Sequence, residues 1–495
     1  MKTMTKAALG AALIAVSAPA SAITFVNVVT VAGDMNDLSG LATGPNTTRL
    51  GGFGSDLVYD RATNTYTGMS DRGPGGGLLD YAPRLQSFSL DINAATGVAS
   101  NFNLVKTTLF TQANGSYFTG LNPLLATGSK GSLGGSLDPE GLTVLPNGNY
   151  LVADEYGPSV YEIDITGKQV RAFDVPANLV PTEAGGAVNY VDGRPTIVSG
   201  RQDNRGYEGI TLSPDGTKAY AIMQDPLVNE GASNDGRRSR NLRIVEFDVA
   251  TGKSTGQYIY QLDSLTTINA NTPGDTFSAT NQGRSIGVSS ITTLPDGRMV
   301  VLERDNRGVG IDDPTGLRQI GIKAAYIIDL SQATDVAGVS LAGSNALPAG
   351  VNAVAKSPLL DIRAALLAQG ITISEKMEGL VFGPRLADGG LSMLVITDND
   401  FSVTQTGAGD QFDICTSGTG AGAVFTQIAL GGACPQGQSL VPTRIYAFRL
   451  SAAEANALGM GVPEPASWAM LLAGFGMGCA MLRRRRNAAA QTQAA

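Results

Sequence analysis

Three glutamates, each followed by glycine, recur at distant points of the sequence and could do chemistry together. They stand in the phrases Asp138-Pro-Glu140-Gly141, Gly206-Tyr-Glu208-Gly209 and Lys376-Met-Glu378-Gly379. Carboxylates that lie close together repel one another, so they need a neighbouring cation or a bound proton. Calcium prefers oxygen ligands and suits such a cluster. We therefore take these glutamates as candidate catalytic residues. A structural role, in which each glutamate ties its own turn to a backbone amide, stays open.

Further polar side chains stand near the ends of apolar runs, where loops begin. Mixed carboxylates and guanidiniums can hold a phosphate group through a metal ion and bidentate hydrogen bonds. Solvated loop ends are often acidic as well, so a single carboxylate of this set is not diagnostic. The candidate metal ligands are Asp71, Asp154, Glu155, Glu303 and Asp398, and the candidate substrate-binding residues are Arg72, Arg205, Arg304 and Lys376.

The chain contains no histidine. A Ser-His-Asp or Cys-His nucleophile system is therefore excluded, and so are imidazole zinc sites and a histidine nucleophile. Any hydrolysis must rest on carboxylates, on a hard metal ion such as calcium, or on lysine or tyrosine.

The elements that must position these residues follow a repeated strand-turn-strand pattern. Each unit has an apolar run, a second apolar run and then a third. In four of the five units Pro and an Asn-Gly or Asp-Gly pair stand between the first two runs. Each glutamate is expected immediately before the first strand of its unit. The paired runs span 56–71, 142–154, 210–224, 291–303 and 380–398, and the third runs span 86–91, 160–164, 243–248, 325–329 and 444–448.

This repetition predicts an all-β fold, with a β-propeller as its architecture. The units recur every 70 to 90 residues or so, which is longer than an ordinary propeller blade of about 40–50 residues. We therefore expect about five to six irregular blades with insertions. A β-sandwich with a second β domain is the alternative.

Charge and cysteine content agree with a protein outside the cytoplasm. The net charge is −8, and both ends of the chain are basic, so the central part is more acidic still. This argues against nucleic acid as a partner and is compatible with divalent cations. Cys415 and Cys434 are close in sequence, and in an oxidising compartment we expect them to form a disulfide worth about 3 kcal/mol.

The N-terminus has the layout of a signal peptide. Lys2 and Lys6 precede an apolar stretch over 7–16, and small residues end at Ala22, where we expect signal peptidase to cut. The apolar stretch is too short to span a membrane comfortably, which argues against an uncleaved anchor.

The C-terminus carries an uncharged segment followed by four arginines. Residues 466–482 are long enough to cross a bilayer, and Arg483–Arg486 would keep their side of it in the cytoplasm. The order Pro463-Glu464-Pro465, a Gly-rich apolar segment and then Arg483 resembles the PEP-CTERM sorting signal. The resemblance implies a Gram-negative bacterium and an exosortase-type enzyme that cuts near Pro463. A plain tail anchor that is never cut is the alternative.

Several phrases of the central part resemble the family called esterase-like activity of phytase. They are Asp-Pro-Glu-Gly-Leu (138–142), Val-Ala-Asp-Glu-Tyr-Gly-Pro (152–158), Asn-Arg-Gly-Tyr-Glu-Gly-Ile (204–210), Glu-Lys-Met-Glu-Gly-Leu (375–380) and Ile-Thr-Asp-Asn-Asp-Phe (396–401). The resemblance implies a phytase-like propeller that hydrolyses phosphate or carboxylic esters. The expected organisation is a signal peptide (1–22), a propeller domain (23–455), a linker (456–465), a transmembrane sorting helix with its arginine block (466–486) and a polar tail (487–495).

Three functions follow as hypotheses. The first is an exported, metal-assisted hydrolase of phosphate or carboxylic esters, with calcium as the expected cofactor and an anionic ester as the ligand. The second is a non-catalytic protein of the cell envelope or matrix whose propeller binds calcium or glycan. The third is a metal lactonase of the gluconolactonase-like kind. In each case the protein would touch a membrane only through its C-terminal helix, before processing.

Overall fold

The computed structural model of the chain describes residues 23–407 and 409–461. The predicted cleavage site at Ala22 lies outside these residues. So do the sorting residues Pro463, Glu464, Pro465 and Arg483 and the predicted transmembrane helix. Within the described part of the chain, no helix is long and apolar enough to cross a membrane.

The described residues are mostly strands, which confirms the all-β expectation. Four antiparallel sheets follow one another along the chain, and in each of them consecutive strands pair with their neighbours. The first sheet holds β2 (Leu57–Asp60), β3 (Thr65–Met69), β4 (Arg84–Ile92) and β5 (Ala99–Leu109), and the second holds β6 (Pro139–Val144), β7 (Tyr150–Asp154), β8 (Val160–Ile163) and β9 (Gln169–Ala172). The third holds β12 (Tyr207–Leu212), β13 (Lys218–Met223), β14 (Asn241–Asp248) and β15 (Lys253–Gln261), and the fourth holds β16 (Ile286–Thr293), β17 (Met299–Asp305), β18 (Lys323–Asp329) and β19 (Ala355–Asp361).

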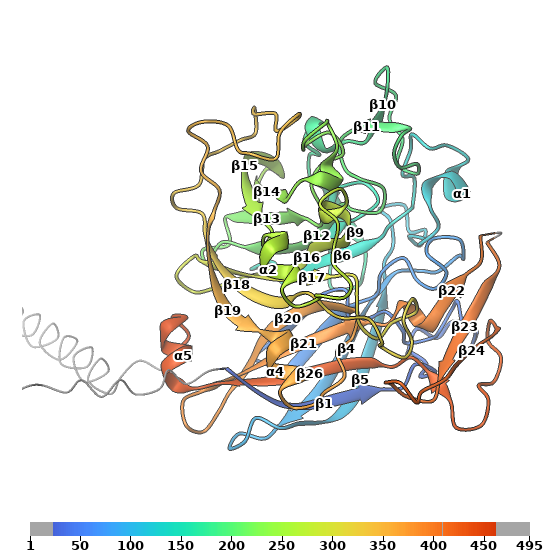
Figure 1. Cartoon of the computed structure of the whole chain (residues 1–495). Coiled ribbons are helices and arrows are strands. Elements are labelled where there is room, and N and C mark those ends of the chain that lie inside the picture. Colours follow the sequence, from blue (N-terminus) through green and yellow to red (C-terminus); the bar gives the residue numbers. More distant parts are fainter. Residues whose placement is uncertain (1–22, 408, 462–495) are drawn as a thin grey trace, which may run out of the picture.

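A fifth sheet joins the two ends of the described chain. Its order is β20 (Lys376–Arg385), β21 (Leu391–Asp398), β26 (Thr443–Leu450) and β1 (Thr24–Val31). β1 runs antiparallel to β26, with Val28 opposite Tyr446, and the two strands lie side by side in Figure 1. The last sheet is therefore completed by the first strand of the chain.

The first strands of the five sheets contact one another in a cyclic order. β2 contacts β6, β6 contacts β12, β12 contacts β16, β16 contacts β20, and β20 contacts β2. Asp56 reinforces this arrangement, because its carboxylate accepts hydrogen bonds from the backbone amides of Leu57 and Leu142, both at 2.8 Å. A hollow of about 240 Å³ is lined by residues from all five of these first strands.

The hydrophobic core has the same cyclic arrangement, since each main cluster fills the space between two neighbouring sheets. Leu85 of the first sheet packs with Val152 of the second, and Ala153 of the second packs in the same cluster as Ala221 of the third. The other clusters join the third sheet to the fourth, the fourth to the fifth, and the fifth back to the first. Each sheet is therefore covered by a hydrophobic cluster on both of its faces.

The turns between first and second strands have the chemistry that the sequence predicts. Gly148 and Gly297 have φ values of 89°, a left-handed conformation that residues with a side chain resist. The Asn-Gly and Asp-Gly pairs therefore end the first strand sharply and start the second one in register.

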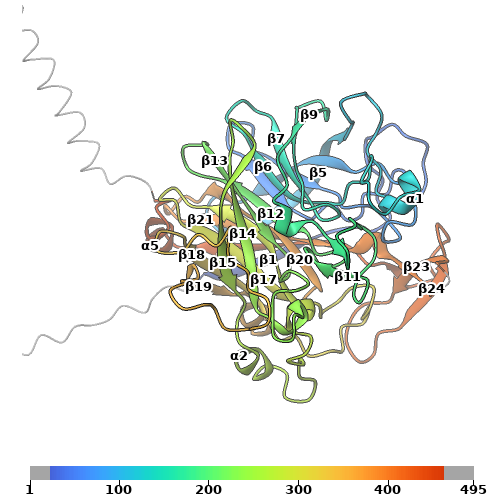
Figure 2. The same cartoon turned by 90° about the horizontal axis from the view of Figure 1, so that it is seen from above.

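The remaining elements lie in the connections between these strands, except α5, which follows β26. β10 (Thr182–Glu183) pairs with β11 (Ile197–Ser199), and a sixth sheet stands at the side of the molecule in Figures 1 and 2. That sheet holds β22 (Val403–Gln405), β23 (Gln411–Thr416), β24 (Phe425–Ala429) and β25 (Ser439–Leu440). The helices are α1 (Pro123–Thr127), α2 (Leu265–Asn269), α3 (Gln282–Ser285), α4 (Ile362–Leu367) and α5 (Ala452–Ala457), with 3₁₀ turns η1 (Ala177–Leu179), η2 (Gly236–Arg238) and η3 (Asp400–Ser402).

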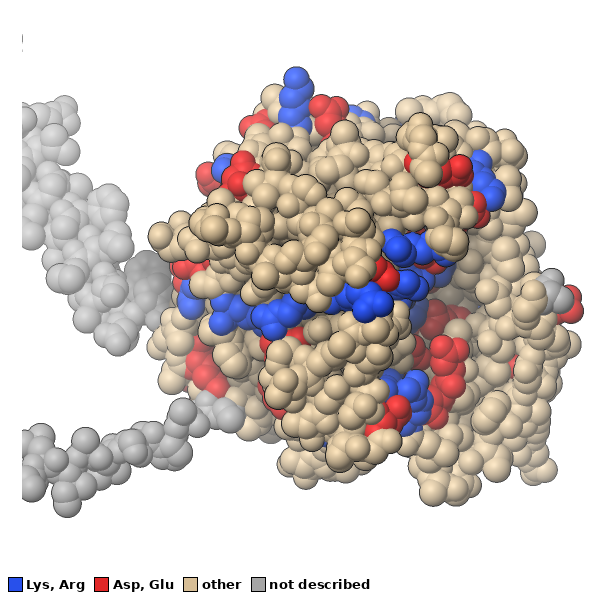
Figure 3. All heavy atoms as spheres, turned by 45° about the horizontal axis from the view of Figure 1, so that its top comes forward, with Lys and Arg blue, Asp and Glu red and all other residues tan. Residues whose placement is uncertain are grey.

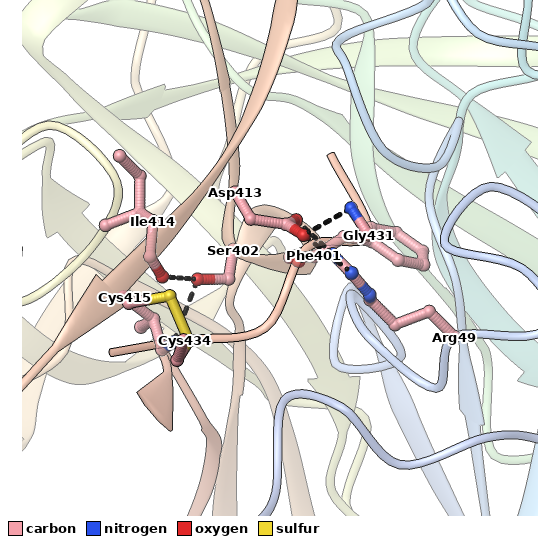
Figure 4. The surroundings of a disulfide bond; sticks show 9 residues. Arg49, Phe401, Ser402, Asp413, Ile414, Cys415, Gly431 and Cys434 are labelled. Atoms are coloured by element: carbon pink, nitrogen blue, oxygen red, sulfur yellow. Dashed lines mark hydrogen bonds and ion pairs between the residues drawn. A yellow bond between two sulfur atoms is a disulfide. The ribbon is translucent and has the colours of Figure 1, made fainter. Parts of the chain in front are cut away.

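The predicted disulfide between Cys415 and Cys434 is present and lies in the sixth sheet (Figure 4). Beside it, the Arg49 guanidinium donates to both oxygens of Asp413, at 2.6 and 3.0 Å. The Ser402 hydroxyl donates to the carbonyl of Ile414 at 2.6 Å. These buried contacts fasten the sixth sheet to η3 and to the loop before β2.

Candidate functional site

The three glutamates lie inside the first strands and not immediately before them, which corrects the expectation from the sequence. Each occupies a point where the strand register shifts, between Pro139 and Gly141, between Tyr207 and Gly209, or between Met377 and Gly379. A β-bulge redirects the extra residue, and bulges are frequent beside active sites. The backbone thus turns Glu140, Glu208 and Glu378 out of the ordinary alternation of the strand.

The glycine after each glutamate has a packing role. A Cβ atom on Gly141 would lie 2.7 Å from the backbone carbon of Gly209, and one on Gly209 would lie 2.9 Å from the backbone nitrogen of Ile291. Real Cβ atoms do not approach a backbone so closely, so a side chain here would push neighbouring first strands apart. The Glu-Gly pair therefore combines a redirected carboxylate with a close contact between sheets.

All three glutamates line one cavity of about 250 Å³ at the end of the first strands where the bulges lie. Eight carboxylates face four cationic side chains in it, so the lining is acidic. The carboxylates are Asp71, Glu140, Glu155, Glu208, Asp312, Glu375, Glu378 and Asp400, and the cations are Arg72, Arg205, Arg304 and Lys376. The cavity thus unites all three candidate catalytic residues and all four candidate substrate-binding residues.

Three of the five predicted metal ligands do not line the cavity: Asp154, Glu303 and Asp398. The first two have partners elsewhere in the fold. The carboxylate of Asp154 accepts hydrogen bonds from the backbone amides of Asp138, Tyr156 and Gly157, at 2.9, 3.2 and 3.0 Å. Glu303 accepts from the Tyr260 hydroxyl at 2.7 Å and from the Lys356 ammonium at 2.6 Å. Both side chains have partners that stabilise the fold, and neither lines the cavity.

Arg304 links two of the three glutamates. Its guanidinium lies 2.5 Å from an oxygen of Glu378 and 3.4 Å from an oxygen of Glu208. Arg205 lies beside the same group, with its guanidinium 3.0 Å from Asp225 and 3.8 Å from Glu155. The two arginines partly compensate the negative charge of this wall.

The other two cationic residues of the lining, Lys376 and Arg72, are also paired with carboxylates. The Lys376 ammonium donates to Asp398 at 3.0 Å and to Asp400 at 2.5 Å. Asp398 thus lies behind Lys376, outside the lining. Arg72 donates from its backbone amide and its guanidinium to Asp138, both at 3.1 Å.

One oxygen of each of the three glutamates has no hydrogen-bond partner among the described residues. These atoms are Oε2 of Glu140, Glu208 and Glu378, and all three are buried. An unsatisfied buried polar atom costs roughly 1–3 kcal/mol. Such a cost at three neighbouring positions indicates a site that is completed by a polar or cationic ligand.

The pKa values of these carboxyl groups reflect burial and mutual repulsion. Burial raises the pKa of Glu140 well above its ordinary value, and the charges of Glu208, Asp138 and Glu378 raise it further. Burial also raises the pKa of Glu378 to about 7, although Lys376 and Arg304 oppose the shift. A nearby cation would favour the ionised forms of both groups.

Two groups of carboxylates lie close enough together that each could hold a metal ion. Asp71, Asp138 and Glu140 each offer one oxygen, and these oxygens lie within 4.8 Å of one another; Asp71, Asp398 and Asp400 form a second such group. Lys376 pairs with two of the three carboxylates of the second group, and Arg72 pairs with Asp138 of the first. The first group contains the unpartnered Oε2 of Glu140, so it is the better candidate metal centre.

Asp138 and Asp400 are site residues that the sequence reasoning did not select. Each stands two positions from a residue that was selected, Asp138 before Glu140 and Asp400 after Asp398. Residues two apart on an extended strand point to the same face. The sequence carries this spacing, but the bulge at Glu140 and the turn at Asp400 interrupt the extended backbone on which the rule depends.

The sequence matches known protein families and one curated relative. Residues 48–401 match the phytase-like family, described as esterase-like activity of phytase, and residues 461–486 match the PEP-CTERM protein-sorting motif. An uncharacterized secreted protein of Arthroderma benhamiae is 29% identical over 312 residues, which are 52% of this chain. The match spans 59% of that relative's length.

The chain is also similar, at low TM-scores, to solved structures that include three enzymes. A luciferin-regenerating enzyme is 10% identical (85% of this chain, 95% of that chain, TM-score 0.30), and a putative 6-phosphogluconolactonase from Bacteroides uniformis is 12% identical (84%, 98%, TM-score 0.29). Virginiamycin B lyase from Staphylococcus aureus is 10% identical (86%, 99%, TM-score 0.29). At these scores the neighbours assign neither an architecture nor an activity to this chain.

The sorting motif and the secreted relative establish that the protein is exported to the cell envelope or beyond, and the motif implies processing by an exosortase-type enzyme. The phytase-like match covers well over half of the chain and contains Glu140, Glu208 and Glu378. The chain therefore belongs to the phytase-like family, described as esterase-like activity of phytase.

Proposed function

We propose that this exported protein hydrolyses phosphate or carboxylic esters in the cavity, with a divalent cation held by Asp71, Asp138 and Glu140. The observation that carries the proposal is that carboxylates and cationic side chains line the same cavity. Unpartnered, buried carboxylate oxygens lie beside arginine and lysine side chains that can bind an anion.

The residues present fit a hard cation such as calcium. The donors are all oxygens, and their spacing of up to 4.8 Å suits one ion that binds oxygen at about 2.3–2.6 Å. The excess of carboxylates over cationic side chains would also be reduced by a divalent ion. When bound, such an ion polarises a phosphoryl or carbonyl oxygen and makes water more acidic.

The protein's own side chains would orient the substrate and handle protons. Arg205, Arg304 and Lys376 can donate charge-assisted hydrogen bonds to an anionic ester. A general acid or base works best with a pKa near the working pH. Glu378, with a pKa of about 7, is suited to give a proton to the leaving oxygen or take one from water.

We infer that the five cyclically arranged sheets are the blades of a five-bladed propeller, with the sixth sheet as an insertion in the last blade. The contact order of the first strands supports this architecture, as do the clusters of core residues between successive sheets. In a propeller the equivalent positions of the blades meet around one axis, which would explain why glutamates distant in sequence share a cavity.

The test is hydrolysis of phytate, p-nitrophenyl esters and a lactone, with calcium and after EDTA treatment. We expect turnover with calcium, loss of turnover in EDTA, and loss in the variant Glu140→Gln. The exposed Asp174→Asn serves as a charge-matched control and should behave as the wild type. Turnover that chelation leaves intact would disprove the metal mechanism, and no turnover across the panel would disprove the hydrolase.

A second function, calcium binding without catalysis in the cell envelope or matrix, is favoured by one observation. Arg304, Arg205 and Lys376 are all engaged in ion pairs, so an anionic substrate would have to compete with Glu378, Asp225 and Asp400. Calorimetry that detects calcium binding, together with no turnover of any ester, would favour this alternative.

A further inference from the structure

Arginines gather on one face of the molecule, beside the cavity. Figure 3 shows basic side chains in a band across the face that it presents, although the chain as a whole has a net charge of −8. Five arginines from neighbouring segments form a set that we call the arginine track. It consists of Arg194, Arg205, Arg237, Arg238 and Arg284.

The track is continuous with the cavity because its segments pack against one another. Arg205 itself lines the cavity. The Arg284 guanidinium donates to the carboxylate of Asp203 at 3.0 Å, two residues from Arg205. α3, which carries Arg284, contacts η2, which carries Arg237 and Arg238. An extended ligand on the track would therefore reach the cavity.

The track has more positive charge than its own carboxylates neutralise. Arg194, Arg237 and Arg238 share the single carboxylate of Asp235, with nitrogen–oxygen distances of 3.8, 2.7 and 3.9 Å. One carboxylate can balance only one of these three charges. The Nε atom of Arg238 also has no hydrogen-bond partner among the described residues. Guanidinium groups that are not neutralised by a carboxylate of the protein can bind an external anion.

These side chains are also accessible. Those of Arg237, Arg238 and Arg284 are 42%, 39% and 27% exposed. Each can therefore reach a ligand on the surface while its backbone stays fixed by η2 or α3. A row of such groups binds a polymer with repeated anionic groups more tightly than a single anion, because each contact adds to the next.

We propose that the arginine track binds an acidic polysaccharide, a glycan chain with carboxylate or sulfate groups along its length, and leads it to the cavity. Guanidinium groups bind such oxyanions through paired hydrogen bonds. The delivery of the polysaccharide to the cavity rests on the proposed function, because the hydrolysed ester would then be a substituent of this polymer. The binding half stands without it.

The residues around the track favour a glycan over a single-stranded nucleic acid. Proteins that bind single strands stack the bases on aromatic side chains. Segments 191–206, 226–240 and 281–285, which carry the five arginines, contain no phenylalanine, tyrosine or tryptophan. The protein is also exported, as its sorting motif indicates. The track therefore offers charge and hydrogen bonds but no stacking surface.

The experiment measures binding of the full-length protein to polyuronate, to a sulfated polysaccharide, to neutral dextran and to single-stranded DNA. We expect binding to one or both acidic glycans, none to dextran, and weaker binding as salt rises, since salt screens exposed charges. The double variant Arg237→Gln/Arg238→Gln should lose at least about tenfold in affinity. Arg61→Gln/Arg385→Gln, with the same change in charge at exposed positions outside the track, should keep the wild-type affinity.

Two results would overturn the inference. One is equal affinity of the track variant and its control for every acidic glycan, and the other is tighter binding of single-stranded DNA than of either glycan. Glu140→Gln separates this inference from the proposed function. If it abolishes ester hydrolysis and leaves glycan binding intact, both stand, whereas glycan binding without any hydrolysis in the wild type leaves only the binding half.

Discussion

Glu140 is the residue on which the metal proposal depends most directly. It is buried, one of its oxygens has no partner, and neighbouring carboxylates raise its pKa. In a chelator its charge has no compensation, so removal of that charge should stabilise the fold.

We expect Glu140→Gln to raise the free energy of unfolding in EDTA at pH 8 by roughly 1–3 kcal/mol. We also expect it to weaken calcium binding at least about tenfold. Denaturant unfolding and calorimetry measure these effects, and Asp174→Asn is the matched control because Asp174 is exposed. A variant that is less stable in EDTA and still binds calcium normally would contradict the assignment.

The raised pKa values of three other buried carboxyl groups make the stability of the fold depend on pH. Burial raises the pKa of Asp225 to about 6, of Asp154 to about 7 and of Glu375 to about 8. Because these folded-state values lie above the unfolded ones, folding favours the protonated forms. The stabilisation is present at low pH and is lost as the pH rises through this range.

We therefore expect the unfolding midpoint in EDTA to fall as the pH increases from about 4, near the unfolded-state pKa values, to about 8, the folded-state pKa of Glu375. The substitution Asp225→Asn removes one of the titrating groups and should make the fall shallower. Calorimetric scans at several pH values measure both effects. A midpoint that rises over this range, or a variant with the slope of the wild type, would contradict the assignment.

At the scale of elements, the close approach of neighbouring first strands depends on glycine, which has no side chain. The three atoms nearest to a Cβ atom on Gly141 would be backbone atoms of Gly209 and Ile210, at 2.7 to 2.8 Å. Backbone cannot move aside as a flexible side chain can, so β6 and β12 would have to separate.

We expect Gly141→Ala to lower the free energy of unfolding by roughly 2–3 kcal/mol. Gly338→Ala is the control, since a Cβ atom there meets nothing within 4 Å and its φ is not left-handed. Urea titration of both variants measures the difference. Equal stability of the two would show that the first strands are not in the close contact described.

At the scale of the whole molecule, β1 connects the start of the described chain to its end. It supplies the outer strand of the sheet that contains β20 and β21, which carry Glu378 and Asp398. Its side chains also enter the core, where Phe25 packs edge-on against Phe448 with ring centres 5.8 Å apart. Removal of β1 would leave β26 with an open edge.

We expect a chain that begins at Ile23 to fold normally, and one that begins at Ala32 to lose roughly 10 °C or more in its unfolding midpoint. Circular dichroism on heating compares the two chains, and the amount of soluble protein gives a second measure. Equal midpoints would mean that β26 does not need its outer partner.

The sequence alone determined the C-terminal sorting signal, the all-β class, the repeated strands, the disulfide and the three Glu-Gly pairs. These features depend on local chemistry: Asn-Gly and Asp-Gly fix turns, alternation fixes strands, and Cys415 and Cys434 lie close along the chain. Local patterns of this kind can be read without knowing the neighbours of a residue in space.

Only the tertiary structure decided which carboxylates meet. It turns Glu140 out of the alternation of its strand through a bulge and brings Asp138 and Asp71 beside it. It leaves Glu303 buried and paired with Lys356, away from the cavity. The arginine track likewise joins residues from segments 194–205 and 237–284. Such groupings depend on the packing of sheets distant in sequence, and burial then sets their pKa values, so no spacing along the chain could have supplied them.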